Sequence, residues 1–318
     1  MGTLRNVALL ALALQLVPAF AVGDGAQRFD SPQGAVAALV EAVRSDKLRQ
    51  LRGILGPGAE RLLHSGDAAE DALGGRKFIA AFDEAHSIVL QGSDESQAEL
   101  QIGRAAWPLP IPLARDADGR WHFNAAAGAA EVLARRIGQN ELSAMQVCLA
   151  IVDAEREYAM RHAAPTAPGE YTRRFRSSPG QHDGLYWPTP PGAEPSPLGP
   201  LLTAASREGY AKARPGGRLP YQGYFYKLLT AQGPDAPGGA YDYVVQGKLL
   251  GGIAVMAYPA RYGASGVKSF IVSQNRVLYE KDLGPDTATL AHATRVFNPD
   301  AAWQELPVAD YGQAPLPP

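Results

Sequence analysis

The hydrophobic residues of the first predicted element repeat three and four positions apart. The repeat is carried by Val36, Leu39, Val40 and Val43. This spacing predicts an amphipathic helix, with Ser31 as its N-cap and Pro32 in its first turn. The same period predicts a second helix at residues 48–55 and a third at residues 77–86.

After residue 86, hydrophobic and polar positions alternate every second residue, which is the period of a β-strand. The segments are SIVLQG, AELQIG, WPLPIPLAR and RWHFNA. The stretch Asp116–Ala117–Asp118–Gly119 is a strong turn signal between the last two segments. Helices followed by antiparallel strands predict an α+β domain with a curved sheet, placed at residues 29–128.

A helical pattern returns between Ala125 and Met160. We expect this helix to break near Gly138 and to restart with Asn140 as a new N-cap. Glu141 would then lie at a helix N-terminus, where the macrodipole favours a negative charge.

The single cysteine, Cys148, lies within the apolar stripe of this helix. The stripe consists of Leu142, Met145, Cys148, Leu149 and Val152. No histidine lies near it in the sequence to activate the thiol, so we predict a buried core residue. Four polar residues are predicted to form the solvated face: Asp153, Glu155, Arg156 and Glu157.

The rest of the chain predicts a second domain at residues 129–310, in which the long helix packs on an antiparallel sheet. A proline- and glycine-rich segment comes first, with one short helix at Leu201–Arg207. The segment FIVSQNRVLYEKD predicts a hairpin that turns at Gln274–Asn275. The segment GPDAPGGAYDY lacks the lysine of a phosphate-binding loop, so we interpret it as a hairpin loop.

Residues 1–21 have the parts of a secretory signal peptide. Arg5 precedes the apolar run Val7–Val17, and Ala19–Phe20–Ala21 is a small-x-small cleavage site. We expect cleavage after Ala21 and a periplasmic or secreted protein without a stable membrane span, with an uncleaved anchor as the alternative. A net charge of -2 argues against a nucleic-acid partner.

Two groups of residues are candidates for ligand binding. The first is Tyr221, Tyr224, Tyr226, Tyr241 and Tyr243, and the second is His182, Asp183 and Trp187. Exposed aromatic faces bind glycans or peptides, but such tyrosines more often form half of a core, and Trp187 more often anchors a loop. The six histidines and one cysteine show no metal-ligand spacing, so we predict no metal, no cofactor and no catalytic residue.

Parts of the chain resemble two known fold families. SPQGAVAALVEAVRSDKLRQL and DGRWHFN are similar to cone-shaped proteins of the nuclear-transport-factor-like group. NELSAMQVCLAIVDAEREY, with the strands after it, resembles pilin-like and pseudopilin-like proteins. A true pilin has its helix at the processed N-terminus, whereas here a whole domain precedes the helix.

From Phe29 to Trp303 the chain resembles the secreted bacterial family called domain of unknown function 2950. The resemblance is carried by ILGPGAERLLHSGD, WPLPIPLARDADGRWHFNAAAGAAEVLARRIGQNEL, DGLYWP, SPLGPL and LTAQGPDAPGGAYDYVV. It implies an exported bacterial protein and no particular activity. We therefore expect a non-catalytic module that binds an envelope protein or glycan, with an envelope hydrolase acting between the two domains as the alternative.

Overall fold

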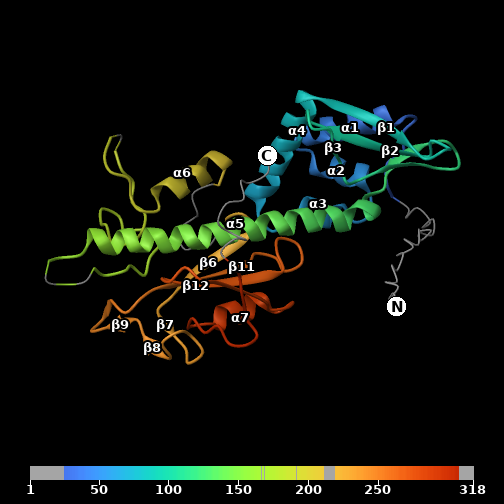
Figure 1. The fold of residues 1–318 in the computed structure, drawn as a ribbon. Helices are drawn as coiled ribbons and strands as arrows, with labels where there is room; N and C mark the ends of the chain where they lie inside the picture. Colours follow the sequence, from blue (N-terminus) through green and yellow to red (C-terminus); the bar gives the residue numbers. More distant parts are fainter. Residues whose placement is uncertain (1–24, 166, 168, 191, 211–218, 308–318) are drawn as a thin grey trace, which may run out of the picture.

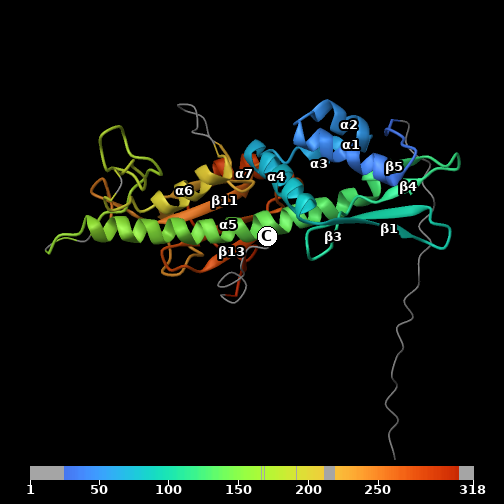
Figure 2. The same ribbon diagram turned by 90° about the horizontal axis from the view of Figure 1, so that it is seen from above.

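The computed structural model describes residues 25–165, 167, 169–190, 192–210 and 219–307 of the chain. The predicted signal peptide lies outside these residues. The fold is α+β, as predicted, and it is organised around one long helix, α5 (Ala125–Arg161). Figures 1 and 2 show α5 joining an N-terminal part at one end to a C-terminal sheet that packs along its other half.

The N-terminal part consists of four helices and a five-stranded antiparallel sheet. The elements are α1 (Pro32–Arg44), α2 (Leu48–Leu55), α3 (Ala59–Leu63), α4 (Ala68–Glu84), β1 (His86–Gln91), β2 (Gln97–Ile102), β3 (Trp107–Pro108), β4 (Leu113–Arg115) and β5 (Trp121–Phe123). The strand order is β1-β2-β4-β5, and β3 also pairs with β2. Helices α1 and α2 cover a core to which Leu100, Leu113 and Phe123 contribute from the sheet.

Two of the helices in this part, α1 and α4, begin at a residue whose side chain caps them. The Ser31 hydroxyl accepts a hydrogen bond from the Gly34 amide at 3.1 Å, which confirms the predicted N-cap of α1. Helix α4 begins at Ala68 rather than at residue 77, because the Asp67 carboxylate caps it by accepting from the amides of Ala69 and Glu70.

Helix α5 is continuous for 37 residues, so the predicted break near Gly138 is wrong. Asn124 caps the helix, its side chain accepting from the Ala127 amide. A glycine within a helix costs only about 1 kcal/mol relative to alanine, and tertiary packing on both sides of Gly138 outweighs that cost. Asn140 and Glu141 consequently lie within the helix, and their side chains contact the C-terminal part.

The C-terminal part is built on a second five-stranded antiparallel sheet. Its strands are β6 (Tyr224–Leu229), β11 (Ala254–Pro259), β12 (Lys268–Ser273), β13 (Leu278–Asp282) and β14 (Gln304–Glu305), in the order β14-β13-β12-β11-β6. The predicted hairpin at Gln274–Asn275 is confirmed as the β12–β13 connection. Helix α6 (Gly199–Glu208) confirms the short helix predicted at Leu201–Arg207.

Smaller elements complete this part. They are β7 (Ala231–Gln232), β8 (Tyr241–Asp242), β9 (Val244–Val245), β10 (Lys248–Leu249) and α7 (Thr287–Ala293). Strands β7 and β8 pair, which confirms that the glycine-rich segment between them is a hairpin loop. Gly238 and Gly239 both have positive φ in this loop, a conformation that glycine adopts without strain.

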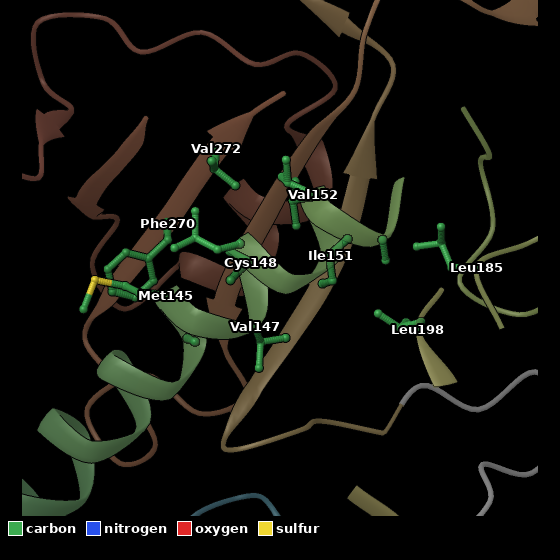
Figure 3. Close-up of a cluster of buried hydrophobic side chains, with 14 of the residues drawn as sticks. Met145, Val147, Cys148, Ile151, Val152, Leu185, Leu198, Phe270 and Val272 are labelled. Atoms are coloured by element: carbon green, nitrogen blue, oxygen red, sulfur yellow. The ribbon is translucent and has the colours of Figure 1, made fainter. Parts of the chain in front are cut away.

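Both faces of the C-terminal sheet are covered, so alternate residues of its central strands enter two different cores. Val255 and Ala257 face α5, whereas Ala254 and Met256 face the side of α7. Cys148 is completely buried in the first core, as predicted, and Figure 3 shows it among Met145, Val152, Phe270 and Val272. Burial raises the pKa of its thiol well above the usual range.

One polar residue of α5 lies on the opposite side from its prediction. Glu155, predicted to face solvent, is completely buried, and its Oε2 accepts from the Thr172 amide at 3.0 Å. Burial raises the pKa of this carboxyl to about 8. The sequence does not reveal this side of α5, because it is covered by the irregular segment that follows the helix. Across the described helices, none combines the length and hydropathy needed to cross a membrane.

Candidate functional site

The five tyrosines predicted to bind a ligand do not form one surface. Tyr224 is completely buried, and it packs with the half-buried Tyr221 and Tyr226 in the core beside α5. Tyr243 is also completely buried, but it belongs to the core on the other face of the sheet. Tyr241 is the exposed member, and its ring lies 5.4 Å from that of Tyr243. The ligand-binding role of these residues remains a prediction.

The second predicted group holds the loop after α5 together. The exposed His182 ring stacks on Trp187 at 4.2 Å, and Trp187 is buried in the core beside α5. The Asp183 carboxylate accepts from the Ser178 amide at 2.7 Å and from the Arg174 guanidinium at 3.0 Å. The Ser178 hydrogen bonds are the main reason why the Asp183 pKa lies below its usual range. These three residues have the contacts of a loop anchor, and their predicted role with a ligand stays a prediction.

A cluster of ionisable and polar groups lies where the two parts meet at the middle of α5. We call it the junction, and it consists of Asp67, Glu70, Asn140, Tyr210 and Gly223. Asp67 and Glu70 come from the start of α4, Asn140 from α5, and the other two from the segments before β6. The aromatic and hairpin patterns of the sequence did not indicate it.

Asp67 is the centre of the junction and is 2% exposed. Its Oδ1 accepts from the amides of Ala69 and Glu70, which caps α4. Its Oδ2 accepts from the Tyr210 hydroxyl at 3.0 Å and from the Gly223 amide at 3.1 Å. Burial raises the pKa of Asp67 despite these four hydrogen bonds, which oppose the shift. A single carboxylate therefore caps a helix of the N-terminal part and binds two residues of the C-terminal part.

Glu70 lies one turn further along α4, and its Oε2 has no exposed surface. Burial, with a smaller contribution from the neighbouring Asp67 charge, raises the pKa of Glu70 to about 7. The amide of Asn140 and the guanidinium of Arg136 act in the opposite direction. Glu70 consequently keeps its proton to a higher pH than an exposed glutamate does.

Two residues of α5 complete the connection between the parts. The Asn140 amide donates to the Ser265 carbonyl at 3.0 Å, and Ser265 lies in the turn between β11 and β12. The Arg136 guanidinium donates to the carbonyls of Arg61 and Leu62 in α3. Both side chains are in the stretch of α5 that was predicted to be interrupted, so the continuous helix is what aligns them.

Only glycine fits at position 223. Its φ is +73°, and a Cβ atom there would lie 2.4 Å from Asn140 Nδ2 and 3.1 Å from Glu70 Oε2. Strand β6, which starts at Tyr224, therefore begins in direct contact with α4 and α5. A side chain at this position would have to separate the groups that form the junction.

Two carboxyl groups with raised pKa values beside a tyrosine are a combination that enzymes use for acid–base chemistry. In the junction, however, both Asp67 oxygens accept hydrogen bonds from protein groups. Two open hollows on the described surface lie elsewhere. One is lined by Tyr186, Pro195 and Arg207, and the other by Asp94, Arg115 and Asp116. The arrangement suits the joining of two parts better than the reception of a substrate.

Within the ranges that the structure describes, no group of three or more His, Cys, Asp or Glu side chains is placed to bind a metal ion.

Comparison with known proteins gave one informative result. No curated protein and no solved structure matches the chain. A family model described as "Protein of unknown function (DUF2950)" matches residues 26–306, which is most of the chain. The protein with this junction therefore belongs to the family of unknown function DUF2950.

Proposed function

We propose that this protein is an exported bacterial protein that acts in the cell envelope as a non-catalytic binding or assembly module. The observation that carries the proposal is the junction, in which both oxygens of Asp67 accept hydrogen bonds from protein groups and so join two parts of the molecule. The signal-peptide pattern of residues 1–21 supports export.

The arrangement of α5 supports a scaffold role. Its first half packs on the N-terminal part, and its second half packs on the C-terminal sheet. We extend the proposal to the two fold resemblances: a cone-like N-terminal part and a pilin-like C-terminal part, held at fixed distance by one helix. Because the long helix is internal, we do not extend it to a filament of the usual pilin kind.

The alternative function is an envelope hydrolase with its site between the two parts. The pKa of Glu70, raised to about 7 next to Asp67, favours this alternative, because a general acid or base works best near the ambient pH. The hydrogen bonds that both Asp67 oxygens accept from protein groups weigh against it.

The Glu70→Gln variant distinguishes the two functions, because the amide keeps the shape of the side chain and removes its proton chemistry. The probe is an isolated envelope fraction of the source bacterium, incubated with the purified mature protein. We expect both the wild type and Glu70→Gln to co-sediment equally with the fraction and to release no soluble fragments. Release of fragments by the wild type but not by Glu70→Gln would replace the proposal by the hydrolase.

A further inference from the structure

Strand β1 has an edge on which a further strand can add. It is the end strand in the order β1-β2-β4-β5, and it pairs with β2 over six residues, from His86 opposite Ile102 to Gln91 opposite Gln97. Along its other side, no strand among the described residues pairs with it. In Figure 2, β1 lies at the lower margin of the N-terminal part. Its outward N–H and C=O groups are therefore available for hydrogen bonds.

The composition of β1 lacks the devices that normally block such an edge. Natural edge strands are protected by lysine, proline or a bulge. The sequence of β1 is HSIVLQ, which contains no Lys, Arg, Asp, Glu, Pro or Gly. Five of its six residues are exposed, including Val89 at 40% and Leu90 at 44%. An exposed strand of this composition is a template for pairing.

The charge around β1 selects the kind of partner. The segment from residue 83 to residue 104 carries five carboxylates and a single guanidinium, that of Arg104, which pairs with Glu84 at 2.9 Å. Three of the carboxylates, Asp94, Glu95 and Glu99, lie at the hairpin turn or on β2, and Glu99 is directly opposite Val89. Before β1, Asp83 pairs with Arg44 and Glu84 pairs with Arg104. The net negative charge therefore lies at the turn and on β2, and it would attract a basic segment along the edge.

We propose that the outer edge of β1 binds an extended, basic polypeptide segment as an added strand of the N-terminal sheet. Backbone hydrogen bonds to β1 hold the segment, as in other proteins that bind peptides by strand addition. Alternate side chains of the segment contact two different faces. Apolar residues pack beside Ile88 and Leu90, and lysine or arginine residues on the other face extend over Val89 toward Glu99.

The probe for this proposal is a synthetic ten-residue peptide that alternates Lys and Val, titrated into the purified mature protein. We expect it to slow the amide hydrogen exchange of β1, with an affinity that falls as the salt concentration rises. The analogue with Glu in place of Lys is expected to bind about tenfold more weakly or not at all, because it meets the acidic surface with like charge.

Variants of β1 show whether the peptide uses this edge. Val89→Lys is expected to weaken binding of the Lys–Val peptide by about tenfold, since it places a positive charge beside the added strand. Val245→Lys is the matched control, because Val245 is 46% exposed in β9, on the C-terminal part. It should leave the affinity unchanged.

Two proline variants add an internal control. Successive N–H groups of a strand point to opposite edges, so one of Val89→Pro and Leu90→Pro loses a bond to β2 and the other loses only the outward N–H. The variant that loses only the outward N–H should keep the thermal midpoint of the wild type. The same variant should no longer bind the peptide at the free edge. If that variant binds as the wild type does, the proposal is wrong.

Other outcomes also overturn the proposal. They are equal binding of the Lys and Glu peptides, an unchanged affinity in Val89→Lys, and a dimer that protects β1 without any peptide, which would make a second copy the occupant. The inference rests on the proposed envelope-binding role, because that role would bring β1 to its partner in the cell. The experiments nevertheless test the envelope role and the β1 edge independently. Loss of envelope co-sedimentation with intact peptide binding would reject only the envelope role, and the reverse result would reject only the β1 edge.

Discussion

The two halves of α5 make contacts of opposite chemical character. Around Cys148 the helix buries apolar side chains against the C-terminal sheet, and the packing depends on shape and volume. Around Asn140 it makes directional hydrogen bonds and lies against Glu70, a carboxyl group whose pKa burial raises to about 7. One half of the helix therefore stabilises the C-terminal part, whereas the other half determines how the two parts are joined.

The largest expected effect comes from placing a charge in the apolar half of α5. Cys148→Asp should lower the free energy of unfolding by more than about 4 kcal/mol, because it buries a charge without a partner. Cys148→Ala removes only a small group and should cost about 1–2 kcal/mol. Chemical denaturation of both variants tests this contrast. Rapid alkylation of Cys148 in the native wild type at neutral pH would show that the thiol is not core.

The next largest effect comes from adding a side chain at Gly223, inside the junction. Gly223→Ala should cost about 2–3 kcal/mol, because it combines a strained positive φ with the clash against Asn140. Gly239→Ala is the control, since its φ is +77° but nothing lies within 4 Å of its added Cβ. That variant should cost only about 1 kcal/mol by thermal or chemical unfolding. Equal losses in the two variants would mean that the junction tolerates a side chain.

A third effect is a dependence of stability on pH. The folded protein raises the pKa of Glu70 to about 7 and that of Glu155 to about 8, from 4.5 for each. The unfolded chain therefore loses these protons first, and the free energy of unfolding should fall as the pH rises from about 4.5 to about 8. The slope is at most about 1.4 kcal/mol per pH unit for each group.

Glutamine variants assign this slope to its two sources. Glu70→Gln and Glu155→Gln should each flatten part of the curve, with Glu70 acting at lower pH. Denaturant titrations between pH 5 and pH 9 make the measurement. A wild-type curve that rises over this range would contradict the assignment of raised pKa values.

The sequence predicted those elements whose signals are local. Helical periodicity and the Ser31 cap located α1, and the Asn275 turn located the β12–β13 hairpin. The stripe through Cys148 predicted its burial correctly, because one face of α5 packs on a sheet. Glu155 was misplaced because α5 is covered on more than one side, and its position next to a charged Arg156 gives no sign of that cover.

The junction could be predicted only in part. Asp67 and Glu70 have the spacing of a capping box, which signals the start of α4 but leaves no trace in the hydrophobic periodicity. Their partners could not be found in the same way, since Tyr210 and Gly223 lie 143 and 156 residues from Asp67 in the chain. Nothing in a single sequence indicates a contact between residues that are so far apart in the chain.

The central claim is that Asp67 joins the two parts of the molecule, and a double-mutant cycle between Asp67→Ala and Tyr210→Phe tests it most directly. The cycle removes the effect of each single change, including the lost cap of α4, and leaves the interaction between the two side chains. Free energies of unfolding for the four proteins should give a coupling of about 1–2 kcal/mol, as for a buried hydrogen bond to a carboxylate. A coupling indistinguishable from zero would contradict the account, because the carboxylate would then not hold the C-terminal part through Tyr210.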